Sequence, residues 1–266
     1  MYSHAENDTT FATSLGCHAE GSGSVAGSTG DPVIREYKFA AHAEGISTLA
    51  RAEGSHAEGY RTQALGKYSH AEGYRSIVNN DYSHAEGYDT QANAAISHTE
   101  GYSTFTGGER DYNDLTPGGS VTNGVYAHAE GNATIAQGCA SHAEGLLTFA
   151  SGYVSHAEGA KTEARGQYAH AEGYNTLANS DYSHAGGIGT SATAEAQTVI
   201  GKYNAENPDA LFIVGNGTKK TNGSSTVIGL TNAFEVISTT DGVSIKIGET
   251  TITEAQLQQL LSLISN

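Results

Sequence analysis

Residues 55–68 read Ser-His-Ala-Glu-Gly-Tyr-Arg-Thr-Gln-Ala-Leu-Gly-Lys-Tyr, and from residue 69 the chain begins the same pattern again. His-Ala-Glu-Gly or a close variant recurs along most of the chain, and nine of the eleven spacings between successive histidines are 14 residues. The other two spacings are 24 and 30 residues, which is one repeat plus an insertion. A fixed short period predicts a stack of similar coils rather than a globular core. The motif histidines are His4, His18, His42, His56, His70, His84, His98, His128, His142, His156, His170 and His184.

Each repeat fits two short strands separated by turns that often contain glycine. The residue before the histidine, and those one, six and eight positions after it, are small in nearly every repeat. Because side chains alternate along a strand, we expect these small residues to fill a flat interior between two closely spaced strands. Positions five, seven and nine vary freely, as in Arg61, Gln63 and Leu65, and are predicted to face solvent.

The histidine and glutamate of each repeat share the opposite face of the first strand. This polar face hardly changes between repeats, which indicates a constant environment, most simply contact with further copies of the chain. Coils stacked about 4.8 Å apart would place the glutamates in a column, where two charges about 5 Å apart repel by roughly 3 kcal/mol. We therefore expect His and Glu to pair between neighbouring coils or subunits, with histidine pKa values above about 6.5. The expected interface residues are His42, Glu44, His56, Glu58, His70, Glu72, His84, Glu86, His142, Glu144, His156, Glu158, His170 and Glu172.

The repeat resembles that of YadA-type trimeric adhesin heads, Ser-Val-Ala-Ile-Gly-x-x-Ala/Thr-x-Ala-x-Gly. The resemblance covers residues 1–196 and implies an all-β fold, a left-handed parallel β-roll of 14-residue coils that assembles as a homotrimer. His56 and Glu58, with their equivalents, would replace the apolar pair at the subunit interface. The His-Ala-Glu-Gly form is also similar to repeats in tail-fibre and tail-appendage proteins of phages and prophages, where stretches like residues 198–204 and 210–218 close the repeats.

Composition excludes several classes of function. The formal net charge of −16 argues against a nucleic-acid surface. No secretory signal peptide opens the chain and no apolar run is long enough for membrane insertion. Cys17 and Cys139 do not form a disulfide framework. No nucleophile with a base and an orienting group stands out from the repeats, so we expect no enzyme activity, cofactor or catalytic residue.

The domain organisation follows from where the repeats stop. Residues 1–196 are predicted to form a twelve-coil β-roll with loop insertions near 27–39 and 107–125. Residues 197–252 are predicted to form a small β-rich module, with strands at 211–214, 234–237 and 243–247. Residues 253–266 show a capping box and an apolar stripe, which predict an amphipathic terminal helix able to support trimerisation. Aromatic and arginine side chains make the insertions candidate receptor-contact loops: Arg35, Tyr37, Phe39, Arg110, Tyr112 and Leu115.

Together these features predict a non-enzymatic structural or receptor-binding segment of a phage-like tail fibre, located in the virion or in a cell-surface appendage. The expected partners are further copies of the chain in a homotrimer, other virion or appendage proteins, and a host-surface receptor. One alternative is a metal-binding array, because histidine and glutamate two residues apart on one strand face are suitable ligands. A trimeric surface adhesin head and an ice-binding threonine row are further alternatives.

Overall fold

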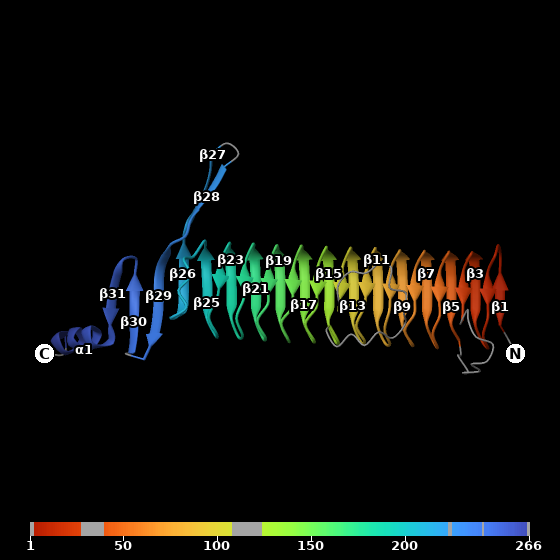
Figure 1. Cartoon of the computed structure of the whole chain (residues 1–266), viewed down its shortest axis with the longest axis horizontal. Coiled ribbons are helices and arrows are strands. Elements are labelled where there is room, and N and C mark those ends of the chain that lie inside the picture. The colour runs from red at the N-terminus through yellow and green to blue at the C-terminus, as the bar shows by residue number, and fades with distance from the viewer. Residues whose placement is uncertain (1–2, 28–39, 108–123, 223–224, 241, 265–266) are drawn as a thin grey trace. The chain divides into compact units, whose positions relative to one another are not determined.

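The computed structural model describes residues 3–27, 40–107, 124–222, 225–240 and 242–264. The chain divides into two compact units, Met1–Leu147 and Thr148–Asn266. Both contain parallel β-solenoid, about 13 turns in all, and the one helix of the described residues lies at the C-terminal end of the chain (Figure 1). The fold is therefore all-β apart from this helix.

Long and short strands alternate along the first unit, nine long and eight short in the described residues, and each type of strand pairs in parallel with its own kind. The long strands are β1 (His4–Glu6), β3 (His18–Ser22), β5 (His42–Ile46), β7 (His56–Tyr60), β9 (His70–Tyr74), β11 (His84–Tyr88), β13 (His98–Tyr102), β15 (His128–Asn132) and β17 (His142–Leu146). The short strands are β2 (Phe11–Ala12), β4 (Val25–Ala26), β6 (Leu49–Ala50), β8 (Gln63–Ala64), β10 (Ile77–Val78), β12 (Gln91–Ala92), β14 (Phe105–Thr106) and β16 (Ile135–Ala136).

The register of the long strands pairs identical positions. His56 lies opposite His42 on one side and His70 on the other, and glutamate and glycine positions align in the same way. The pairing also holds across the first insertion, where His18 lies opposite His42. Every position of the motif therefore becomes a continuous column within the unit.

The interior of the first unit is built from the small residues, as the sequence predicts. Ala57 and Ala64 are completely buried, and Ser55 and Thr62 are no more than 1% exposed. The Ser55 hydroxyl donates a hydrogen bond of 2.7 Å to the carbonyl oxygen of Ala52, which satisfies a polar group inside this thin core. The prediction that positions five, seven and nine of the repeat face solvent is confirmed only in part, since Leu65 is 3% exposed.

The second unit begins with the same type of coil. Its long strands are β19 (His156–Ala160), β21 (His170–Tyr174), β23 (His184–Ile188) and β25 (Thr198–Lys202). Its short strands are β18 (Phe149–Ala150), β20 (Glu163–Ala164), β22 (Leu177–Ala178) and β24 (Ser191–Ala192). Parallel pairing continues past residue 196, because Val199 takes the buried alanine position opposite Ala185, and Ile213 follows opposite Val199.

The C-terminal strands are antiparallel. β26 (Ala210–Asn216) pairs with β29 (Asn232–Thr239), which continues to β30 (Gly242–Ile247) and β31 (Thr250–Thr253). β27 (Thr218–Asn222) and β28 (Ser225–Gly229) form a separate two-stranded sheet. The predicted strands at 211–214, 234–237 and 243–247 are confirmed, since they fall within β26, β29 and β30.

The terminal helix, α1 (Glu254–Ile264), has the predicted capping box. The Gln256 amide donates to the Thr253 hydroxyl oxygen at 3.3 Å, and the Thr253 amide donates to the Gln256 side-chain oxygen at 2.9 Å. The helix buries none of its residues, and Leu261 and Ile264 are 61% and 79% exposed. Among the described residues, no helix has the length and apolarity needed to cross a membrane.

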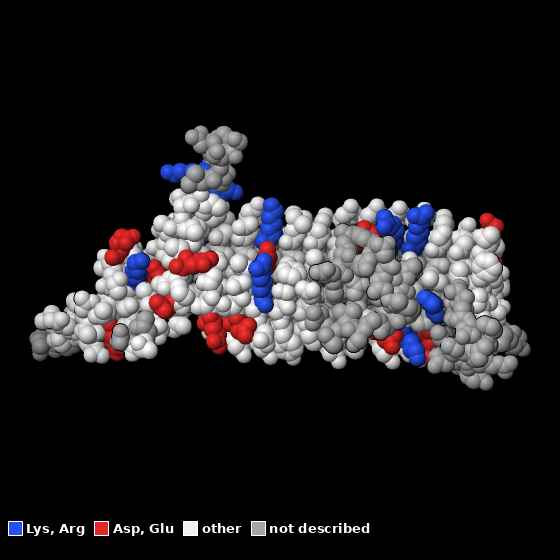
Figure 2. Space-filling model, viewed as in Figure 1, with Lys and Arg blue, Asp and Glu red and all other residues white. Residues whose placement is uncertain are grey.

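The charged side chains of the visible face lie mostly in small groups. Figure 2 shows lysine and arginine side chains separated from one another, several of them beside acidic side chains. This distribution differs from the continuous basic stripe with which proteins bind nucleic acid.

Candidate functional site

The outward face of the long strands carries the histidine, the glutamate and the residue two positions after the glutamate. In β7 these are His56, Glu58 and Tyr60, and the completely buried Ala57 between them points inward. We call the outward histidines and glutamates of the long strands the His/Glu ladder. The third position adds an aromatic or aliphatic row beside it, in which Ile46 and Leu146 are 50% and 44% exposed.

The imidazoles of the first unit form a stacked column. From His18 to His142, successive ring centroids are 4.7–4.9 Å apart and the ring planes differ by no more than 6°. Forming the column costs free energy, because several of its Nε2 atoms are buried without a hydrogen-bond partner. These are the Nε2 atoms of His18, His42, His56, His70, His84, His98 and His128.

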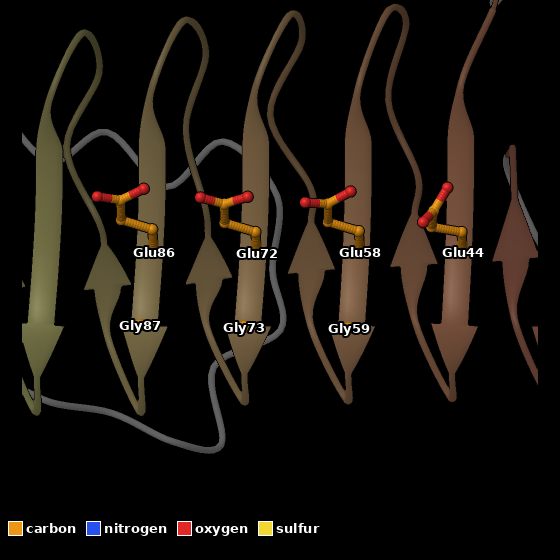
Figure 3. Close-up of a pocket in the computed structure, with 7 residues that line it drawn as sticks. All are labelled: Glu44, Glu58, Gly59, Glu72, Gly73, Glu86 and Gly87. Carbon is orange, nitrogen blue, oxygen red and sulfur yellow. The ribbon is translucent and has the colours of Figure 1, made fainter.

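The glutamates form a second column parallel to the first. Figure 3 shows the carboxyl groups of Glu44, Glu58, Glu72 and Glu86 projecting from successive long strands. They line a groove of about 470 Å³ whose floor includes the intervening glycines of three coils. The column therefore presents oxygen atoms at the spacing of the coils along an open channel.

Histidine and glutamate of one coil approach each other without forming a hydrogen bond over most of the first unit. From His18–Glu20 to His128–Glu130 the closest Nε2 to carboxylate oxygen distances are 3.5–4.0 Å. The His4 and Glu6 side chains of β1 are closer, with Nε2 3.2 Å from Oε1. The attraction within a coil is therefore electrostatic and exposed to screening.

The second unit shows a different pairing. His170 Nε2 lies 3.3 Å from Glu158 Oε1, in the preceding coil, and His184 Nε2 lies 3.5 Å from Glu172. Gly186 stands where other coils have glutamate, so β23 carries no glutamate at the ladder position beside His184. Its ring is turned 84° from that of His170.

The carboxyl groups share protons along the column. Hydrogen bonds with Glu86 and Glu58, together with burial, raise the pKa of Glu72 to about 7. Hydrogen bonds with Glu86 and Glu130 raise the pKa of Glu100 to about 7 in the same way. Glu86 and Glu130 accept such bonds, which hold the pKa of each below its usual value of 4.5. Raised and lowered pKa values thus alternate over Glu72, Glu86, Glu100 and Glu130, which reduces the like-charge repulsion among these four groups.

The histidine pKa values are shifted opposite to the sequence-based expectation. Burial lowers the pKa of His42, His56, His84 and His128 below 6.5, and neighbouring imidazoles lower it further. The glutamates only partly offset this effect. The expectation of raised values is therefore wrong for these four side chains, because desolvation and the close histidine stack outweigh carboxylates that lie beyond hydrogen-bond distance.

Replacement of alternate glutamates should have opposite effects on stability. Folding keeps a proton on Glu72 that the unfolded chain loses above about pH 4.5, so wild-type stability falls as the pH rises from there to about 7. Glu72→Gln removes this loss and should stabilise the chain by about 1 kcal/mol at pH 8.5, after allowance for screening of a side chain about one-third exposed. The gain should nearly vanish at pH 4.5. Urea unfolding monitored by circular dichroism at both pH values measures the difference.

Glu86→Gln is the matched control. The folded chain lowers the pKa of Glu86, so its charge contributes stability above about pH 4.5 that is lost as the pH falls through the folded value. Glu86→Gln should therefore destabilise the chain at about pH 6, where Glu72 and Glu100 still hold the protons that they donate to Glu86. Equal effects of the two substitutions would show that the carboxyl groups do not alternate.

Several groups of ladder side chains have the composition and spacing to hold a metal ion. Within each group the candidate ligand atoms lie within 4.8 Å of one another. They include His42–Glu44–His56, His56–Glu58–His70, His128–Glu130–His142, Glu72–His84–Glu86 and Glu86–His98–Glu100.

The structure brings together the predicted ladder residues from His42 to Glu86. The predicted loop residues lie outside the described part of the chain. Those loop residues are Arg35, Tyr37, Phe39, Arg110, Tyr112 and Leu115. Sequence reasoning missed a third column on this face, in which the rings of Tyr60, Tyr74, Tyr88 and Tyr102 stack at 4.6–5.0 Å. The signal was present, because tyrosine follows Glu-Gly in these four successive repeats.

No model of a known protein family matches the chain, and neither does any curated protein. The function is therefore inferred from the geometry of the outward face.

Proposed function

We propose that the chain is a non-enzymatic structural segment of a phage-like tail fibre or appendage, and that it assembles as a homotrimer through the His/Glu ladder face. One observation carries this proposal: in a single chain, this face leaves an aromatic and aliphatic row exposed beside imidazole nitrogen atoms that are buried without partners. Contiguous exposed apolar surface marks interaction sites. Partner chains would cover this exposed row.

The repetition of the face supports self-association. Tyr74, Tyr88 and Tyr102 are 37%, 42% and 52% exposed and stack on one another over successive coils. A surface with the same residues at every rung can contact copies of itself along its whole length, as closed symmetric assemblies require. Aromatic side chains are also the residue type most enriched at the centres of interfaces.

The terminal helix supports the same assembly. Leu260, Leu263 and Ile264 are 49%, 70% and 79% exposed, so these apolar side chains of α1 face solvent in the single chain. An isolated helix of 11 residues is marginal in water without tertiary packing. Three such helices packed together would bury these side chains.

The resemblance of the repeat to YadA-type heads and to phage tail-fibre repeats completes the proposal. It adds a left-handed coil with a 14-residue period, location in a virion or surface appendage, and contact with other virion or appendage proteins. Recognition of a host-surface receptor would fall to the two insertions.

The mass of the full-length chain in solution tests the assembly. Light scattering should give three times 27.5 kDa, or about 82 kDa. Tyr88→Lys places a charge in the exposed row and should shift the mass toward that of one chain, because three unpaired ammonium groups would be desolvated at the interface. Tyr82→Lys is the matched control, since Tyr82 is 61% exposed but lies in a turn.

The pair of variants separates assembly from folding. Both substitutions replace an exposed, stacked tyrosine with lysine, and circular dichroism of both proteins checks that each remains folded. A wild-type mass of 27.5 kDa would overturn the proposal. So would identical masses of the Tyr88→Lys and Tyr82→Lys proteins.

A further inference from the structure

We propose that the His/Glu ladder of the first unit binds a divalent transition-metal ion of the zinc class through His42, His56 and His70 with the carboxylates of Glu44 and Glu58. This site goes beyond the proposed structural function, and each can hold without the other. The candidate ligand atoms come from three successive long strands, β5, β7 and β9.

The ligand atoms are close enough for coordination after small side-chain movements. In both His42–Glu44–His56 and His56–Glu58–His70, the candidate ligand atoms lie within 4.8 Å of one another. Two nitrogen atoms bound to one zinc ion at about 2.1 Å can be at most about 4.2 Å apart. The histidine side chains are 34–36% exposed and are not held by hydrogen bonds at Nε2, so their rings can tilt toward each other.

The imidazoles lack the partners that a metal ion would supply. The Nε2 atoms of His42, His56 and His70 are buried and make no hydrogen bond. The nearest carboxylate oxygens in their own coils are 3.5, 3.7 and 3.9 Å away. An unpaired buried polar atom costs free energy, and coordination of a shared ion would remove that cost at two imidazoles at once.

Charge and ligand type select the class of ion. The Glu44 and Glu58 carboxyl groups line the open groove next to the imidazoles, so a cation there is favoured electrostatically. Imidazole nitrogen suits zinc, nickel and copper, whereas magnesium and calcium prefer sets of oxygen atoms. Two imidazoles and one carboxylate leave a fourth position for water or a second carboxylate.

The shared ligand fixes the stoichiometry. His56 belongs to both groups, and its single Nε2 atom can ligate only one ion. The two groups therefore compete, and β5, β7 and β9 together hold one ion per chain. Loss of His56 leaves one imidazole and one carboxylate in each group, which is too few for a stable site.

The experiment uses the full-length chain without a histidine tag, freed of metal by dialysis against a chelator. Calorimetric titration with zinc chloride should show micromolar or tighter binding, and magnesium chloride should show none. His56→Gln should lower the number of bound zinc ions by one per chain. Glu163→Gln, which removes a carboxylate from short strand β20, should leave the number unchanged.

A second variant covers the case in which His56→Gln fails to fold, as judged by circular dichroism. Glu44→Gln with Glu58→Gln keeps all imidazoles and should weaken zinc binding at this site by roughly tenfold or more. Absence of zinc binding to the wild-type chain would overturn the proposal, as would an unchanged stoichiometry and affinity in both variants. Light scattering in the presence of chelator reports on the trimer separately, so failure of one proposal does not imply failure of the other.

Discussion

Gly59→Ala is expected to abolish folding of the stacked coils or to lower the free energy of unfolding by more than about 3 kcal/mol. Gly59 has a φ of +107°, a conformation that L-residues rarely adopt. A Cβ atom built there would lie 2.3 Å from the carbonyl oxygen of Gly73 in the next coil. Both the backbone conformation and the close contact oppose any side chain at this position.

The neighbouring coils cannot relieve the clash. The obstructing oxygen belongs to a backbone that is held in the parallel sheet, where Gly59 lies opposite Gly73. Moving that carbonyl would disturb the hydrogen bonds of both coils. A Cβ at Gly45 would meet the Gly59 oxygen in the same way, at 2.1 Å. The glycine of the motif is therefore required by the stacking of coils as well as by the turn.

Gly248→Ala provides the control. Gly248 also has a positive φ, +58°, but a Cβ there would meet nothing within 4 Å. This substitution should cost about 1 kcal/mol, the conformational part alone. Urea unfolding followed by circular dichroism measures both variants, and equal losses would contradict the role assigned to close stacking.

Lys246→Met should destabilise the second unit by about 3 kcal/mol at pH 7, because it leaves a buried carboxylate without its cation. Glu235 is 2% exposed and its Oε1 lies 3.3 Å from the Lys246 ammonium. Its other oxygen accepts a hydrogen bond of 2.6 Å from the Asn207 amide. Burial raises the pKa of Glu235, but hydrogen bonds from Asn207, Asn232 and Lys246 outweigh it, so the pKa is lowered overall.

The pH dependence identifies the cause. In the wild-type chain the ionised Glu235 contributes stability above about pH 4.5, and this contribution is lost as the pH falls through the lowered folded pKa. The loss of stability caused by Lys246→Met should therefore be smaller at acid pH, where the Glu235 carboxyl group is protonated. Thermal melts at pH 7 and pH 4 measure this. Lys202→Met, at an exposed position of β25, should change neither melt appreciably.

Much of the coil could be predicted because its interior accepts only small side chains. The repetition of alanine, serine and threonine at four motif positions already implied an interior too thin for larger residues, and Ala57 and Thr62 are buried as expected. The capping box of α1 was equally predictable, since its geometry depends on residues three apart in the chain.

The electrostatics of the ladder could not be read from the sequence in the same way. The sign of a pKa shift depends on whether His56 and Glu58 lie at 3.7 Å or at hydrogen-bond distance, and on whether Glu72 and Glu86 share a proton. These are differences of less than 1 Å, which a residue pattern does not specify. The coil that begins at Thr198 was not predicted for another reason: it lacks the motif histidine, although Val199 fills the inward position as alanine does elsewhere.

The uniform register also bears on how accurately the chain can fold. In the first unit, each long strand pairs identical motif positions with the next. A chain that loops out one whole coil during folding therefore still forms nearly the same sheet. Coils with a different buried residue make the alternative pairings unequal. Val78 and Thr99 are completely buried where the adjacent coils have alanine. These side chains distinguish one coil from the next and so favour the correct register. We expect their replacement with alanine to make the stack more regular but its folding more error-prone.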